Sequence, residues 1–346
     1  MNRVLVSGLG NASDMGLCDA CDLNFSWLVH YPSILIWCDE ICLPQNALKA
    51  QKSSNDSKND LAINLFLDLA DSANLIKAID LSPLKEAGID IAKAVRPETK
   101  LIYSEVLSNP TLTLVDLKAV AEIAHKNGAY LMVDNTFTTP IAIRPIDFGA
   151  DIVINSLTKF LNGHSDAIGG SITTTQALCD KIQPVAMLLG TPGDPFSSWL
   201  IHRGINTASV RMPQAMHTAE KLAATLATNK HVSRVNHPSL PTYPQKELAD
   251  RMFGKNGYCA MLSFIVPEDL EKIDQFMLAL KFPKYAPTLG GLHTTLSHPV
   301  TSSHMGVPDE TRRKMGITPG MIRVSVGIED ADDLAADFEN ALKVFD

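Results

Sequence analysis

Apolar runs and helical patterns alternate along the chain from about residue 75 onward. The runs at 100–105, 129–134 and 151–155 and the glycine-rich run at 168–174 predict strands, and the run at 151–155 predicts a buried one. Between the first two, the residues at 114, 117, 120, 121 and 124 form one apolar face and predict a helix over 113–127 that ends at Gly128. This alternation is typical of a parallel sheet flanked by helices, so we expect an α/β fold.

Three further helices are predicted from the same patterns. Ser82-Pro83 opens a helix toward Val95, with proline in a favoured first-turn position. A long helix is expected over 211–228, and a last one over 330–345 has an apolar stripe of Leu334, Phe338 and Leu342.

The length of the chain predicts more than one folding unit. At 346 residues it exceeds the usual size of a single core. We expect an atypical N-terminal segment over 1–74, a large-domain portion over 75–231 and a smaller C-terminal α/β domain over 232–346. The polar run at 51–60 is typical of a linker or an exposed loop.

The composition of the chain limits the kinds of partner that it can bind. Charged residues make up 20% of the chain and hydrophobic residues 45%, as in a globular protein. The net charge of -8 argues against a nucleic-acid surface, which needs clustered lysine and arginine. No apolar stretch is long enough to span a membrane and no signal peptide is evident, so we expect no membrane partner and a cytoplasmic protein.

The segment 156–166 places one lysine where its chemistry can change. Lys159 follows the strand at 151–155, has the hydroxyls of Ser156 and Thr158 beside it, and precedes a glycine-rich strand. A lysine in an enclosed pocket loses proton affinity and becomes an amine nucleophile able to form a Schiff base with a carbonyl cofactor. An isolated Ser-x-Thr-Lys would more simply be a surface lysine.

A carboxylate at a neighbouring strand end strengthens the hypothesis of a cofactor site. Asp134 ends the strand at 129–134, and carboxyl ends of parallel strands are where such folds bind ligands. Pyridoxal 5'-phosphate (PLP) needs an amine, a carboxylate that keeps its pyridine nitrogen protonated, and donors for its phosphate. Alone, a strand-terminal aspartate is more often a helix cap or a metal ligand, but here Lys159 follows in the expected order.

From about Val95 to the C-terminus, roughly 250 of the 346 residues, the chain resembles the Cys/Met-metabolism family of PLP enzymes. That family includes cystathionine γ-synthase, cystathionine lyases, methionine γ-lyase and O-acetylhomoserine sulfhydrylase. The resemblance implies the fold type I of aspartate aminotransferase, with a mostly parallel sheet. The matching stretches occur in the family's order, at 105–110, 133–137, 149–153, 156–170, 289–291 and 322–329.

The resemblance also implies roles for single residues. Lys159 is the expected Schiff-base lysine and catalytic residue, and Asp134 the partner of the pyridinium nitrogen. Ser156 and Thr158 are expected to bind the phosphate, and Asn109 to lie near the cofactor ring. The substrate is then an amino acid, with its α-carboxylate held by Arg323 and with Thr288 lining the substrate site. Arginine suits this role independently, because its planar guanidinium binds carboxylates in a bidentate manner.

The first 75 residues depart from the family pattern. The resemblance leads us to expect a Tyr-x-Arg, a Ser-Gly-Met segment and a stacking tyrosine there, and none is present: Ser7-Gly8 is followed by Leu9, and Tyr31 precedes a proline. Family active sites are built between subunits, so we expect a homo-oligomer, but the missing N-terminal motifs place full activity in question.

Within the family the sequence favours a carbon–sulfur lyase similar to methionine γ-lyase. Relatives that act on cystathionine often carry a glutamate at the position of Pro287, which precedes Thr288. A γ-replacement enzyme, such as cystathionine γ-synthase or O-acetylhomoserine sulfhydrylase, is one alternative. A non-catalytic, degenerate relative with a foreign N-terminal module is the other.

Metal and dinucleotide sites are weaker hypotheses, and we expect no metal. Cys18, Cys21, Cys38 and Cys42 could make a tetrahedral zinc site, although their second spacing is loose and buried cysteines are common. His293, His298 and His304 lack the His-x3-His spacing of helical metal sites. Residues 3–13 resemble the start of a dinucleotide fingerprint, but the third glycine and the following helix are missing.

Overall fold

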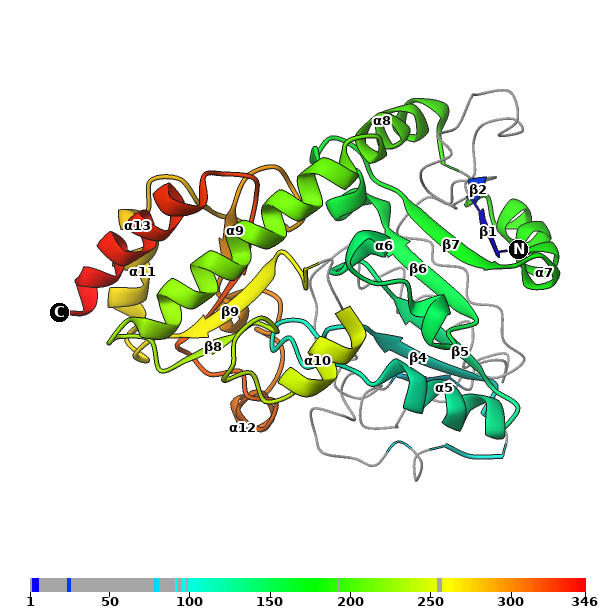
Figure 1. The fold of residues 1–346 in the computed structure, drawn as a ribbon, viewed down its shortest axis with the longest axis horizontal. Coiled ribbons are helices and arrows are strands. Elements are labelled where there is room, and N and C mark those ends of the chain that lie inside the picture. Colours follow the sequence, from blue (N-terminus) through cyan, green and yellow to red (C-terminus); the bar gives the residue numbers. More distant parts are fainter. Residues whose placement is uncertain are drawn as a thin grey trace.

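The computed structural model describes residues 99–191, 193–253 and 257–346, together with shorter pieces at 2–5, 24–25, 78–80, 91 and 95–97. Two β-sheets organise the described part of the chain, and helices pack against both (Figure 1). The α/β fold expected from the alternating patterns is therefore confirmed. The predicted domain boundaries at residues 75 and 232 stay predictions.

The first sheet has seven strands in the order β2-β1-β7-β6-β5-β4-β3. Strands β3 to β6 are parallel, as the alternation with helices predicted. Their carboxyl ends therefore lie along one edge of the sheet. The strands are β1 (Asn2–Leu5), β2 (Asn24–Phe25), β3 (Ala78–Asp80), β4 (Leu101–Glu105), β5 (Tyr130–Asp134), β6 (Ile152–Ser156) and β7 (Gly170–Thr175).

Strand β7 runs antiparallel to β6, so the prediction of a parallel strand at 168–174 was wrong in direction. A parallel connection needs a crossover, usually a helix that packs back on the sheet. The residues between β6 and β7 form a single π-helical turn, η3 (Leu157–Leu161), followed by a loop that closes onto the sheet. The chain therefore returns beside the strand it has just left.

Helix α5 (Leu117–Lys126) covers β5 with the apolar face predicted from the sequence, and its Leu117, Val120, Ala121 and Ala124 are buried. The helix starts four residues later than predicted, because Asp116 caps it by accepting the Ala119 amide at 3.2 Å. Leu114 instead forms an isolated β-bridge with Leu107. Of the helix predicted from Ser82 to Val95, most residues lie outside the described part of the chain.

The remaining helices of this part are α6 (Thr139–Ala142), α7 (Gln176–Leu188), α8 (Pro195–Ile205) and α9 (Ala208–Thr228), with a 3-10 turn at Pro145–Phe148. Helix α9, predicted over 211–228, is the long diagonal helix of Figure 1. It contacts α6, α8 and η3 in the first half of the described chain and α13, β8 and β9 in the second. It thereby connects the two sheets.

The second sheet has five strands in the order β10-β11-β12-β9-β8. The pairs β11–β12, β12–β9 and β9–β8 are antiparallel. Its strands are β8 (Arg234–Asn236), β9 (Met261–Ile265), β10 (Lys284–Tyr285), β11 (Thr295–Ser297) and β12 (Met321–Ser325). The helices around it are α10 (Lys246–Phe253), α11 (Leu270–Ala279), α12 (Asp309–Lys314) and α13 (Ala331–Leu342), with 3-10 turns at Pro299–Thr301 and Lys343–Phe345.

The predicted stripe of the last helix is confirmed, because Leu334, Phe338 and Leu342 are fully buried. Phe338 contacts Phe264 of β9 and Phe276 of α11, with ring centroids 6.1 and 6.0 Å apart. This aromatic cluster fastens α11 and α13 to the sheet that carries Arg323 on β12.

Candidate functional site

The carboxyl ends of β4, β5 and β6 bring the predicted site residues to one edge of the first sheet. Asp134 is in register with Glu105 of β4 and with Ile154 of β6. The Ser156 amide donates to Thr136 Oγ1 at 2.8 Å, which ties the end of β6 to the residues that follow β5. Lys159 lies three residues beyond Ser156, so both predicted charged groups begin from the same edge.

Asp134 is held by donors but lacks a cationic partner among the described residues. Its Oδ1 accepts the Thr136 amide at 2.8 Å, and Tyr103 of β4 also bonds its side chain. Burial raises the pKa of the Asp134 carboxyl above its usual value, and these hydrogen bonds oppose the shift only in part. A buried carboxylate gains from a nearby cation, such as a protonated pyridine nitrogen.

Lys159 lies within the turn η3, where its backbone leaves helical geometry (φ −93°, ψ −136°). Burial lowers the pKa of its ammonium group, and the positive charge of Arg323 lowers it further. Both effects favour the neutral amine, the form that attacks a carbonyl and the form that accepts a proton. The structure thus gives this lysine a lowered pKa, and its role as the Schiff-base residue stays a prediction.

The hydroxyls of Ser156 and Thr158, beside Lys159, differ in their hydrogen bonding. Thr158 Oγ1 accepts the Gly169 amide at 3.0 Å and donates to the Gly169 carbonyl at 3.3 Å. Ser156 Oγ is buried and has no hydrogen-bond partner among the described residues. A buried hydroxyl without a partner is costly, so Ser156 is the better placed of the two to donate to a phosphate oxygen.

Arg323 is 4% exposed and carries no ion pair within the described residues. Its Nη1 donates to Asn109 Oδ1 at 3.2 Å, and its Nη2 donates to the carbonyls of Pro287 and Thr288 at 3.2 and 3.3 Å. Its Nε has no partner in the described part of the chain. Burial lowers the pKa of the guanidinium to about 10, so it remains cationic at neutral pH and suits an anionic ligand.

These bonds also place Asn109 and Thr288. The side-chain oxygen of Asn109 accepts from Arg323, and the expected place of Asn109 near a cofactor ring stays a prediction. Thr288 contacts Arg323 through its main-chain carbonyl, while the residue itself is exposed. The described structure therefore joins Lys159, Arg323, Asn109 and Thr288 in one region, although Asn109 follows β4 of the first sheet and Thr288 precedes β11 of the second.

Sequence reasoning gave no role to two residues of this region. Tyr103 bonds Asp134 from the neighbouring strand, and a polar aromatic residue inside the apolar run at 100–105 was the available signal. Gly290 has a φ of +80°, and a Cβ there would lie 2.9 Å from Lys159 Cα and 2.6 Å from the Phe160 nitrogen. Only glycine allows this loop to approach the lysine so closely.

Nothing in the described part of the chain groups three histidine, cysteine or acidic residues as a metal site would. His293 approaches Glu329, whereas His298 bonds Thr301 and the Pro319 carbonyl, and His304 bonds Ser303. The cysteines at 18, 21, 38 and 42, and the region of the dinucleotide fingerprint beyond residue 5, lie outside the described residues. Among the helices that the structure describes, none is long and apolar enough to cross a membrane.

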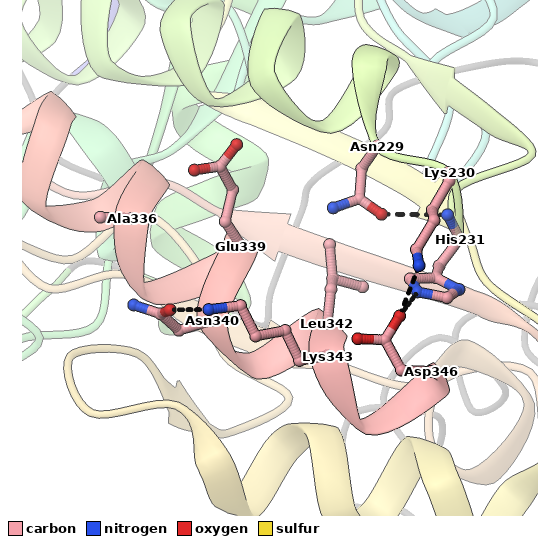
Figure 2. A pocket seen from close by; sticks show the side chains of 9 residues that line it. All are labelled: Asn229, Lys230, His231, Ala336, Glu339, Asn340, Leu342, Lys343 and Asp346. Atoms are coloured by element: carbon pink, nitrogen blue, oxygen red, sulfur yellow. Dashed lines mark hydrogen bonds and ion pairs between the residues drawn. The ribbon is translucent and has the colours of Figure 1, made fainter.

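A surface cavity of about 360 Å³ lies elsewhere, between the C-terminal end of α9 and helix α13 (Figure 2). Its wall includes Asp346, which pairs with Lys230 at 2.7 Å and with His231 at 2.8 Å. None of the predicted site residues lines the cavity. It is separate from the candidate active site.

Three observations agree on the kind of group the site can hold. Lys159 is a partly buried amine, Asp134 is a partly buried carboxyl without a cationic partner among the described residues, and Ser156 Oγ is a buried hydroxyl without a hydrogen-bond partner among them. Together they match the aldehyde, the pyridine nitrogen and the phosphate of PLP. The fold and the site therefore define the class of PLP-dependent enzymes with fold type I.

Comparisons with known proteins give the family. The sequence model of the family of Cys/Met metabolism PLP-dependent enzymes matches residues 75–343 of this chain. The cystathionine beta-lyase MetC of Bacillus subtilis is 40% identical over 255 residues, which cover 73% of this chain and 65% of that protein. The L-methionine gamma-lyase of Porphyromonas gingivalis is 38% identical over 256 residues, 73% of this chain and 64% of that protein.

Solved structures agree. The cystathionine gamma synthase of Xanthomonas oryzae pv. oryzae, in complex with aminoacrylate and cysteine, superposes with a TM-score of 0.73 at 33% identity. The match covers 81% of this chain and 71% of that one. The chain thus belongs to the Cys/Met metabolism family of PLP-dependent enzymes, as its motifs predicted. It spans about two thirds of the length of the curated relatives it matches.

Proposed function

We propose that this chain is a PLP-dependent carbon–sulfur lyase that acts on a sulfur amino acid, similar to methionine γ-lyase. The observation that carries the proposal is the pairing of a partly buried, deprotonation-prone Lys159 with a buried Arg323 that lacks an anionic partner in the described structure. One group suits proton transfer and the other suits an α-carboxylate. Together they fit the reacting end of an amino acid.

PLP, when bound, would withdraw electrons from the α-carbon of the amino acid and so make its α-proton removable. Asp134 would keep the proton on the pyridine nitrogen, since a buried carboxylate gains by a cationic neighbour. Ser156 Oγ would donate to the phosphate. In this proposal the residues of the chain hold the cofactor at both ends.

Arg323 would fix the substrate by its α-carboxylate, with Asn109 and the carbonyls at 287 and 288 holding the guanidinium. The Lys159 amine would take the α-proton and later remove a proton from the β-carbon, so that the sulfur group can leave the γ-carbon and depart as a thiol. After hydrolysis by one water, the products would be a thiol, ammonia and an α-keto acid.

The residue at 287 favours methionine over cystathionine as the substrate. A proline there offers no charge to the distal amino group of cystathionine, and the residue is exposed beside Thr288. A relative with L-methionine gamma-lyase in its name, 38% identical, supports this choice. Similarity to a cystathionine gamma synthase favours the alternative of γ-replacement by a thiol.

The first test is the capture of PLP by the purified chain. The protein is mixed with PLP, reduced with borohydride and digested, and the modified peptide is identified by mass spectrometry. We expect one adduct, on Lys159, and none in a Lys159→Ala variant. An adduct scattered over surface lysines would refute the cofactor site and support the non-catalytic alternative.

Product analysis then separates lyase from synthase. The loaded protein is incubated with methionine, with cystathionine, and with O-acetylhomoserine plus a thiol. The proposal expects α-keto acid and methanethiol from methionine. Formation of a new thioether without keto acid would overturn elimination in favour of replacement.

A homo-oligomer in the cytoplasm completes the proposal. The family resemblance supports shared active sites, and α7 and α8 expose large apolar side chains: Leu188 is 85% exposed, Phe196 67% and Trp199 52%. Clustered exposed apolar residues are typical of protein interfaces. Light scattering after size-exclusion chromatography tests this, and a monomer at all concentrations would contradict it.

A further inference from the structure

Arg211, in the first turns of α9, is a buried cation with an uncommon set of partners. It is 9% exposed, and no carboxylate pairs with it within the described residues. Its guanidinium donates instead to four main-chain carbonyls and one hydroxyl. Buried arginines are rarely tolerated without a specific role for their charge.

Three of those carbonyls belong to the residues that directly follow Lys159. Arg211 Nη1 donates to the Phe160 carbonyl at 2.9 Å, and Nη2 donates to the carbonyls of Leu161 and Asn162 at 2.9 and 3.2 Å. Carbonyls at the end of a helical turn lack partners within that turn. The guanidinium satisfies them with charge-assisted bonds, which are stronger than bonds between neutral groups.

Two further bonds fix the guanidinium itself. Nε donates to Thr207 Oγ1 at 2.9 Å, and Nη2 donates to the Gly204 carbonyl at 2.9 Å. Both partners lie where α8 ends and α9 begins. The arginine therefore joins the lysine-bearing turn η3 to a rigid helical junction.

Glycines allow the turn η3 and the junction of α8 and α9 to pack closely against each other. At Gly163, with φ of +72°, a Cβ would lie 2.0 Å from Arg211 Nη1. At Gly204 a Cβ would lie 2.4 Å from the Asn162 carbonyl oxygen. No side chain fits between the turn and the helices, and Gly290 touches the same turn at Lys159 Cα and the Phe160 nitrogen.

We propose that Arg211 is a positioning residue for Lys159, which clamps the backbone of η3 so that the lysine amine reaches its carbonyl partner in one orientation. The inference rests on the proposed function, in which Lys159 binds PLP. Positioning matters because a displacement of about 1 Å at a reacting group can lower a rate by about 10²-fold. Lysine cannot replace the arginine here, since a single ammonium cannot bind carbonyls on opposite sides in a planar fork.

The test compares Arg211→Lys with the wild-type chain in two measurements. The first is hydrogen exchange without PLP, at the amides of Asn162 and Gly163, which donate to the carbonyls of Leu157 and Lys159 at 3.1 and 2.7 Å. The second is the rate of borohydride-trapped PLP capture at Lys159. We expect about 10-fold faster exchange at these amides and capture slowed by about 10- to 100-fold.

Arg234→Lys is the matched control, because Arg234 also donates to a main-chain carbonyl, that of Gly316 at 3.3 Å, but lies on β8. It should leave both measurements unchanged. Gly204→Ala perturbs the same turn from α8 and should reproduce the effects of Arg211→Lys. This second variant decides the question if Arg211→Lys does not fold.

The outcomes separate the two proposals. No capture at Lys159 in the wild-type chain would refute the proposed function, while faster exchange at 162 and 163 in Arg211→Lys would still support the clamp. Normal capture in the wild type, with unchanged exchange and unchanged capture in folded Arg211→Lys or Gly204→Ala, would overturn the clamp alone.

Discussion

Arg323→Lys tests whether the buried guanidinium recognises the α-carboxylate of the substrate. The substitution keeps a positive charge but removes the planar fork that the carbonyls of Pro287 and Thr288 and the side chain of Asn109 now orient. The Nε donor, without a partner in the described structure, is lost as well. We therefore expect weaker binding of any ligand that carries the carboxylate.

The size of the effect follows from the number of donors lost. A hydrogen bond to a charged group contributes about 1.5–3 kcal/mol, and about 1.4 kcal/mol corresponds to tenfold in affinity. Loss of one such bond to the carboxylate therefore predicts roughly 10- to 150-fold weaker binding. Burial strengthens the effect, because Arg323 is 4% exposed and water screens it little.

The assay is titration of the PLP-loaded protein with methionine, followed by the visible absorbance of the cofactor. The matched ligand is 3-(methylthio)propylamine, which is methionine without its carboxylate. Arg323→Lys should weaken methionine binding strongly and binding of the amine hardly at all. Equal losses for both ligands would refute carboxylate recognition and indicate a general disturbance of the site.

Three other changes have defined outcomes. Asp134→Asn should raise the free energy of unfolding of the PLP-free chain near pH 7, measured by urea denaturation. Burial raises the pKa of this carboxyl, so the folded state must hold its negative charge without a cationic partner among the described residues. The same substitution should weaken PLP binding, because the pyridinium nitrogen then loses its carboxylate partner. Stability of the PLP-free wild type should therefore fall as pH rises from about 3.8 through the raised pKa, and a profile for Asp134→Asn that falls equally would contradict this. The pKa of Lys159 is lowered, so between its folded-state pKa and 10.5 the unfolded chain binds more protons than the folded chain. The free energy of unfolding of the wild type, relative to that of Lys159→Met, should therefore rise with pH across this window. A difference that does not change with pH would contradict the lowered pKa of the amine. Phe338→Ala should cost about 3–5 kcal/mol in urea denaturation, since its ring is fully buried between Phe264 and Phe276, and a loss below about 1 kcal/mol would contradict that packing.

The sequence predicted the parts of the site that local pattern controls. Asp134 and Ser156 stand at strand ends because apolar runs determine where β5 and β6 stop, and Lys159 follows at a fixed distance. Helix α13 showed its buried stripe at helical spacing. Such periodicity reflects which side of an element is buried, and it can be read without knowing the partner.

Contacts between distant segments could not be predicted in this way. Arg211 bonds carbonyls about fifty positions earlier in the chain, and a main-chain acceptor leaves no residue type to recognise. The need for glycine at position 290 is visible only in the folded structure, where Lys159 lies against it. The reversed direction of β7 was missed because an apolar strand has the same pattern in either orientation.

The close approach of Gly290 to Lys159 restricts how this site can be redesigned. Variation for a new substrate can begin at Pro287 and Thr288, which are exposed and contribute main-chain oxygens to Arg323. A library that randomises position 290 would mostly yield inactive chains, because any side chain there would displace the lysine backbone. Diversity at 287 and 288, with 290 held as glycine, gives the larger share of usable variants.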